Sequence, residues 1–149
     1  MLKAPDDRYF IHGGIFLLSN KLQAAGDRKI RKVTTKQWFL LLFIRGMDEE
    51  LSTITEIARQ MDSTRQNVAQ MLGTLEKKGF VSLSVLPGDK RSVGVSLTGK
   101  AYSILDEISK TGNHFIHHLF KGLPEEEIAC TAGLLRKLFE NLENMEKEL

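Results

Sequence analysis

Polar side chains with the chemistry of specific recognition gather between residues 64 and 73. If the apolar residues of this stretch face inward, the opposite face presents long polar residues beside small ones: Arg65, Gln66, Ala69, Gln70 and Gly73, with Asn67 at the flank. Arg, Gln and Asn have paired donors and acceptors that match the edges of guanine and adenine. Outward polar residues are usually only solvated, so this face predicts base contacts only together with a second feature.

The second feature is a basic turn further along the chain. Lys90 and Arg91 end the sequence Leu86–Arg91, whose Pro and Gly indicate a turn. Flexible cations suit a narrow, electronegative minor groove. We expect Asp89 to hold Arg91 through a charge-assisted hydrogen bond. The candidates for phosphate contacts, which position a protein without reading sequence, are Lys36, Thr53, Ser63, Thr64 and the basic stretch from Arg28 to Lys32.

Other reactive side chains give weaker indications. His114 and His118 have the i, i+4 spacing of a metal pair, but a third ligand such as His12 is needed and no local motif supplies it. Solvation at a helix C-terminus is the simpler interpretation. Cys130 follows Ile128 in an apolar sequence, which argues against a reactive thiolate and a peroxide sensor. We therefore expect no metal and no cofactor.

An enzyme is not indicated. Cys130 has no histidine partner within a motif, the chain contains no Gly-rich phosphate loop, and its carboxylates fall on solvated helix faces.

The recognition residues are expected on the second of two short helices. Thr53 and Glu56 have the spacing of a capping box ahead of an apolar pattern that runs to Met61. Thr64 then caps a new helix that ends at Gly79. The apolar residues of the two helices repeat at i, i+3, i+4 and i+7, which predicts that the helices pack together: Ile54, Ile57, Ala58 and Met61, then Val68, Met71, Leu72 and Leu75.

The segments before and after these two helices are predicted to form a β-hairpin and four more helices. Apolar residues alternate with Ser or Gly over 81–85 and 93–97, which indicates two strands. Helices are expected over 6–25, from Thr34 or Thr35 to Arg45, over 99–120, and from Glu125 to the end. The helix ending at Arg45 is apolar nearly all round and should be central to the core. The fold class is thus mainly α with a small β-hairpin, a winged helix-turn-helix with added terminal helices.

Bulk properties agree with this architecture. Residues 28–100 carry 13 basic and 7 acidic residues, whereas residues 101–149 carry 5 basic and 9 acidic ones. This asymmetry is expected if one face meets a polyanion. One cysteine and an N-terminus without a signal-peptide pattern predict a cytoplasmic protein, and the longest apolar run is too short for a membrane helix.

Three sequence segments resemble the MarR family of regulators. They are Val33-Thr34-Thr35-Lys36-Gln37-Trp38, Leu75-Glu76-Lys77-Lys78-Gly79-Phe80-Val81, and Asp89-Lys90-Arg91 followed by Leu97-Thr98. The resemblance implies a single domain over 1–149, with a winged helix-turn-helix lobe at about 33–98 and dimerisation helices at about 1–27 and 101–149. It further implies a homodimer on a pseudo-palindromic DNA operator, a recognition helix starting at Thr64–Gln70, and Arg91 as the minor-groove residue of the wing.

The resemblance also implies a small-molecule effector. In this family, signals usually enter a cleft between the dimerisation helices and the DNA-binding lobe. The candidate lining residues are His12, Phe16, Trp38, Leu42 and Tyr102, although aromatic residues at helical spacing more often belong to the core. The sequence thus predicts a ligand-responsive regulator of transcription, most simply a repressor. The alternative is a winged-helix adaptor that binds proteins, which the modest net charge of +2 and the acidic C-terminal third would suit.

Overall fold

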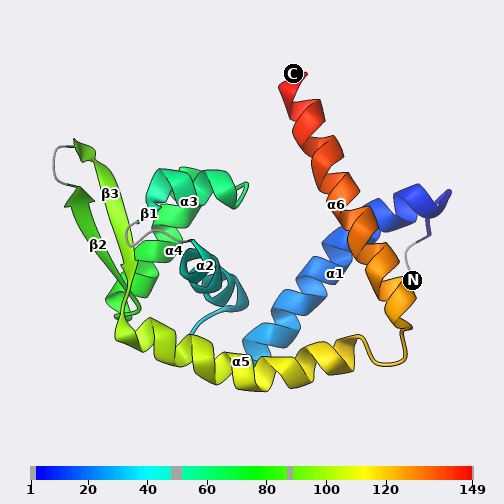
Figure 1. Ribbon diagram of the computed structural model, residues 1–149, viewed down its shortest axis with the longest axis horizontal. Coiled ribbons are helices and arrows are strands. Elements are labelled where there is room, and N and C mark those ends of the chain that lie inside the picture. The colour runs from blue at the N-terminus through cyan, green and yellow to red at the C-terminus, as the bar shows by residue number, and fades with distance from the viewer. Residues whose placement is uncertain (1–2, 48–51, 87–88, 149) are drawn as a thin grey trace. The chain divides into compact units, whose positions relative to one another are not determined.

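The computed structural model describes residues 3–47, 52–86 and 89–148, without the side chains of residues 89–91 and 111. The chain forms two compact units, Met1–Ile108 and Ser109–Leu149. The long helix α5, Gly99–Leu119, contributes its first half to one unit and its second half to the other. The chain is mainly α-helical with one small antiparallel sheet (Figure 1), as the sequence predicts.

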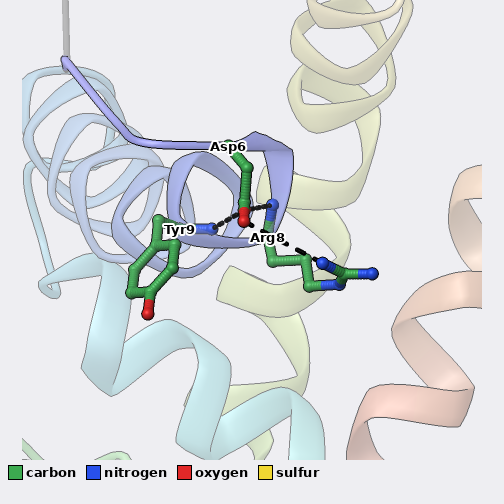
Figure 2. A network of polar contacts seen from close by, with 3 residues as sticks. All are labelled: Asp6, Arg8 and Tyr9. Carbon is green, nitrogen blue, oxygen red and sulfur yellow. Dashed lines mark hydrogen bonds and ion pairs between the residues drawn. The ribbon is translucent and has the colours of Figure 1, made fainter.

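Helix α1 spans Asp7–Lys29. The carboxylate of Asp6 caps it by accepting from the backbone N–H groups of Arg8, at 2.8 Å, and Tyr9, at 3.3 Å (Figure 2). The predicted end at residue 25 is wrong, because Arg28 and Lys29 form its last turn. Basic residues are favoured there by the partial negative charge of a helix C-terminus.

Helix α2, Thr35–Gly46, begins at a full capping box formed by Thr34 and Gln37. Its inner face buries Leu40, Leu41 and Ile44, so the predicted central position is confirmed for that face. Phe39 and Leu42 are nevertheless exposed on the other side. The apolar character all round the helix therefore reflects two surfaces, of which only one is covered within the first unit.

Helices α3, Ile54–Gln60, and α4, Arg65–Lys77, confirm the two predicted short helices. Their apolar faces bury Ile57 and Leu72 completely. The connecting turn places Asp62 at φ 46°, a left-handed conformation that Asp adopts more readily than most residues. This conformation redirects the chain within four residues, so that α4 packs against α3.

The hairpin is formed by β2, Val81–Leu86, and β3, Asp89–Leu97, with Leu83 opposite Val95. A two-residue strand β1, Ser52–Thr53, pairs with the other edge of β3 and gives the sheet order β1-β3-β2. Figure 1 shows the hairpin extending beside α3 and α4. The sequence did not predict β1, because two residues are too few for an alternating pattern.

Within the first unit, one core joins the elements from α2 to the first half of α5. It contains residues of α2, α3, α4, the sheet and the first half of α5: Leu40, Leu41, Ile57, Val68, Leu72, Leu75, Phe80, Val95, Ala101 and Leu105. The polar outer face of α4 is thus supported from behind by packed apolar side chains.

The second unit consists of the end of α5 and of α6, Glu125–Lys147, joined through Gly122 at φ 83°. Helix α6 buries none of its residues, although it carries a row of large apolar side chains: Leu134, Leu135, Leu138, Phe139, Leu142 and Met145. Within the described ranges, no helix is both long and apolar enough to cross a membrane.

Candidate nucleic-acid interface

The outer face of α4 is polar and accessible, as the sequence predicts. Arg65, Gln66, Asn67 and Gln70 are all exposed, while Val68 and Leu72 on the opposite side are fully buried. This separation leaves the long amide and guanidinium groups on the solvent side of a helix that the core holds. The arrangement can present hydrogen-bonding groups to base edges.

The start of α4 is suited to a phosphate. Thr64 is the N-cap residue, and its hydroxyl accepts from the backbone N–H of Asn67 at 3.2 Å. The first turn contains no acidic residue, so no carboxylate within this turn neutralises the positive end of the helix dipole. Thr64 is exposed and Ser63 half-buried beside it. The backbone N–H groups and the dipole at a helix start favour an anion.

Thr53 has a clear structural role at the start of α3. Its hydroxyl and backbone N–H both donate to the carboxylate of Glu56, at 2.7 and 2.8 Å, and the Glu56 backbone N–H donates back to the hydroxyl at 3.2 Å. The hydrogen bonds from the backbone and then the side chain of Thr53 lower the pKa of Glu56. The proton of this hydroxyl is therefore already used within the chain, which weakens the case for Thr53 as a phosphate contact.

The basic residues before α2 lie at the surface. Lys36 is exposed in the first turn of α2, and Arg28 and Arg31 are exposed nearby. Lys32, in contrast, forms a 2.8 Å ion pair with Glu107 of α5. Exposed pairs of this kind contribute little to stability, but this one occupies the Lys32 charge, so Lys36 is the better phosphate candidate of the two.

For the wing residues 89–91, the structure describes the backbone of their strand but not their side chains. Asp89, Lys90 and Arg91 form the start of β3, and their side chains lie outside the described part of the structure, as do residues 87 and 88. The predicted support of Arg91 by Asp89 therefore stays a prediction. At the base of the hairpin, the Thr98 hydroxyl lies 2.8 Å from the carbonyl oxygen of Gly79 and 3.1 Å from that of Phe80, and so ties β3 to the end of α4.

The proposed effector residues come from three helices. His12 and Phe16 are exposed on α1, with ring centroids 5.3 Å apart in an edge-to-face pair. Trp38 is half-buried and Leu42 exposed on α2, and Tyr102 is exposed on α5. The guanidinium of Arg45 lies 5.8 Å from the Tyr102 ring. Accessible aromatic rings are compatible with ligand binding, and the pocket itself stays a prediction.

The remaining reactive groups do not assemble into a centre. Across the described residues, no three His, Cys, Asp or Glu side chains are grouped so that they could hold a metal ion. His114 and His118 are exposed on α5. Cys130 is also exposed, so the expected apolar environment is wrong. Its apolar sequence neighbours lie on an α6 that buries nothing, which is why they do not enclose it.

These features define a winged helix-turn-helix protein: α3 and α4 form the two-helix element, and β2 and β3 form the wing. Residues 32–92 match the family model described as "MarR family". That range contains the whole two-helix element and reaches into the wing. Over this segment the chain is similar to the MarR family of transcriptional regulators.

The similarity extends to individual proteins. The chain is 22% identical over 120 residues to the transcriptional repressor MprA of Escherichia coli (strain K12), an alignment that covers 80% of this chain and 68% of the relative. It has the fold of S. aureus MepR in complex with DNA, with a TM-score of 0.79, 22% identity and coverage of 86% and 94% of the two chains. It also has the fold of Bordetella bronchiseptica BpsR, whose DNA binding is regulated by 6-hydroxynicotinic acid, with a TM-score of 0.72, 20% identity and coverage of 85% and 91%.

Proposed function

We propose that this chain represses transcription by binding a pseudo-palindromic operator as a homodimer. One observation carries the proposal: α4 exposes Arg65, Gln66, Asn67 and Gln70 while its opposite face is fully buried. In this arrangement α4 enters the major groove and the wing reaches the adjacent minor groove. The DNA complex of the S. aureus relative and the repressor function of the E. coli relative support the same conclusion.

The homodimer is supported by apolar surface that the single chain leaves uncovered. Helix α1 buries none of its residues and exposes Phe10, Ile15, Phe16 and Leu18, and helix α6 exposes its row of apolar residues. Helices that expose many large apolar side chains are typical of protein interfaces. A symmetric dimer covers the same surface on both copies and presents two copies of α4 to two half-sites about one helical turn apart.

Regulation by a small molecule is part of the proposal. The accessible aromatic residues of α1, α2 and α5 supply an apolar lining, and BpsR shows that a chain with this fold can respond to a small aromatic acid. We propose that an effector binds among His12, Phe16, Trp38, Leu42 and Tyr102. An effector that binds one arrangement of the two α4 helices better than another changes DNA affinity.

DNA binding is tested with a duplex selected from a random pool by the unaltered chain. Fluorescence anisotropy should show binding that falls steeply with salt, because several phosphates are neutralised and their counterions released. Arg65→Ala should weaken binding by about 1 to 3 kcal/mol. Arg136→Ala is the matched control, because it removes the same side chain from an exposed position on α6. Equal affinities for the two variants would mean that α4 does not face the DNA.

Recovery of no duplex, even in dilute buffer, would contradict DNA binding altogether. In that case the exposed faces of the winged helix would favour the adaptor interpretation, in which the partner is another protein.

A further inference from the structure

The turn formed by residues 32–37, at the start of α2, is bonded to three other helical segments of the first unit. Asp27, near the end of α1, accepts from the backbone N–H and the hydroxyl of Thr35, at 2.6 and 2.7 Å. The ammonium of Lys78, the residue that ends α4, lies 3.3 Å from Gln37 Oε1 and 3.2 Å from the carbonyl oxygen of Lys32. The Lys32 ammonium is paired with Glu107 of α5. Short polar bonds therefore connect α1, α4 and α5 through one turn.

The contact with α1 is close and specific. A Cβ atom added at Gly26 would overlap the hydroxyl of Thr35, so only glycine allows the two helices to approach in this way. The Thr35 hydroxyl also lies 3.1 Å from the carbonyl oxygen of Gln23. An acidic residue in the last turn of a helix opposes the helix dipole. Asp27 stands in that unfavourable position, and its bonds to Thr35 give a reason for it.

The contact with α4 uses a buried acceptor. Gln37 is only 8% exposed, and its Oε1 atom is shared by the backbone N–H of Thr34, at 3.2 Å, and the Lys78 ammonium. Gln37, a member of the capping box that starts α2, thus also accepts a hydrogen bond from Lys78 at the end of α4. Lys78 lies 8 residues beyond Gln70, roughly 12 Å along a helix, so it is not part of the proposed reading face.

We propose that Asp27 and Lys78 are positioning residues that set the direction of α4 relative to α1 through the 32–37 turn. This inference rests on the proposed function, in which α1 takes part in the dimer and α4 reads DNA. A shift of α1 is passed to Thr35, from Thr35 to the capping box, and from Gln37 to the end of α4. Both residues therefore affect DNA affinity without touching DNA.

The sign of the Asp27→Ala effect separates positioning from simple electrostatics. Removing a negative charge from a DNA-binding protein should tighten binding. Loss of positioning should weaken it, by about 3- to 30-fold, the usual range for residues that couple sites without contacting a ligand. Asp27→Asn keeps an acceptor oxygen and should recover most of the affinity. Tighter binding by Asp27→Ala would overturn the proposal.

Lys78 requires a control for charge. Lys78→Met and Lys77→Met each remove one cation from the end of the same helix, but the structure gives polar contacts to other helical segments only for Lys78. Lys78→Met should weaken binding of the selected duplex several-fold more than Lys77→Met, and Lys78→Arg should restore it. Equal losses at the two positions would show that only the charge matters.

The double variant Asp27→Ala/Lys78→Met decides whether the two residues act through one turn. DNA affinity is measured on the full chain and corrected for the fraction of protein that is folded and active. A thermal unfolding curve is recorded for each variant. The double variant should have about the same DNA affinity as whichever single variant binds DNA less tightly. Losses that multiply, or a lower unfolding temperature with unchanged corrected affinity, would overturn the inference alone. Failure of the unaltered chain to bind any selected duplex would overturn the proposed function as well.

Discussion

At the scale of single residues, the wing cation Arg91 is expected to contribute to DNA affinity as much as Arg65 does. Arg91, the proposed minor-groove contact of the wing, lies in β3. Because one good base contact is worth about 1 to 3 kcal/mol, Arg91→Ala should weaken binding of the selected duplex by that amount. Fluorescence anisotropy titrations at two salt concentrations measure this loss of affinity. Unchanged affinity would mean that the wing does not enter the groove.

Replacing Ser52 by alanine is expected to stabilise the protein. The residue is only 1% exposed, and its side-chain oxygen has no hydrogen-bond partner among the residues that the structure describes. A buried polar group without a partner costs free energy, so Ser52→Ala should raise the free energy of unfolding by about 1 kcal/mol. Urea unfolding tests this prediction, with Ser82→Ala on the exposed side of β2 as the control. A destabilised Ser52→Ala variant would contradict it.

At the scale of elements, the capping box fixes the start of α3. Thr53→Ala removes the acceptor for the Glu56 backbone N–H and should lower the free energy of unfolding by about 1 kcal/mol. Thr55→Ala, an exposed position in the same helix, is the matched control and should change stability much less. Equal effects in urea unfolding would show that the cap contributes nothing.

Two capped helix starts also predict how the protein responds to acid. Hydrogen bonds from Thr53 lower the pKa of Glu56, and those from Thr35 lower the pKa of Asp27. A lowered pKa in the folded state contributes stability that is present above the ordinary carboxyl value of about 4 and is lost as the pH falls below it. The thermal midpoint should therefore fall in this acid range less steeply in Asp27→Asn and Glu56→Gln than in the unaltered chain. Parallel curves would contradict the assignment.

The elements that the sequence predicted are those with a strong local signal. The pair Thr53–Glu56 and a capping threonine at position 34 or 35 mark helix starts, and the change of apolar period after Gly79 marks the hairpin, so these elements were predictable. The strand β1 was not, because its pairing with β3 is a long-range contact. The bonds of Asp27 and Lys78 with the 32–37 turn were also beyond the sequence, since they join residues 8 to 46 positions apart.

The candidate site was predictable in part for a related reason. Burial of Val68, Leu72 and Leu75 follows from helical spacing, and it leaves Gln66 and Gln70 outside. In contrast, the use of the Thr53 hydroxyl by Glu56 needs side-chain geometry, because a capping threonine and a phosphate-binding threonine look the same in a sequence.

At the scale of the whole molecule, DNA binding should depend on dimer formation. Leu142 is 56% exposed in the apolar row of α6, so Leu142→Glu should give a monomer by sedimentation. Because two linked half-site contacts bind far more tightly than one, the monomer should lose at least about a hundredfold in DNA affinity. Glu140→Gln, an exposed change elsewhere on α6, should remain dimeric. A Leu142→Glu variant that stays dimeric and binds fully would place the interface elsewhere.

The most direct test of the central claim is a comparison of the duplexes selected from one random pool by the unaltered chain and by Gln66→Ala. If the exposed face of α4 reads base edges, the unaltered chain should select a near-palindrome, and Gln66→Ala should select the same sequence with relaxed preference at one symmetric pair of positions. Two identical selected sequences, or no preferred sequence for the unaltered chain, would contradict the claim that α4 reads DNA.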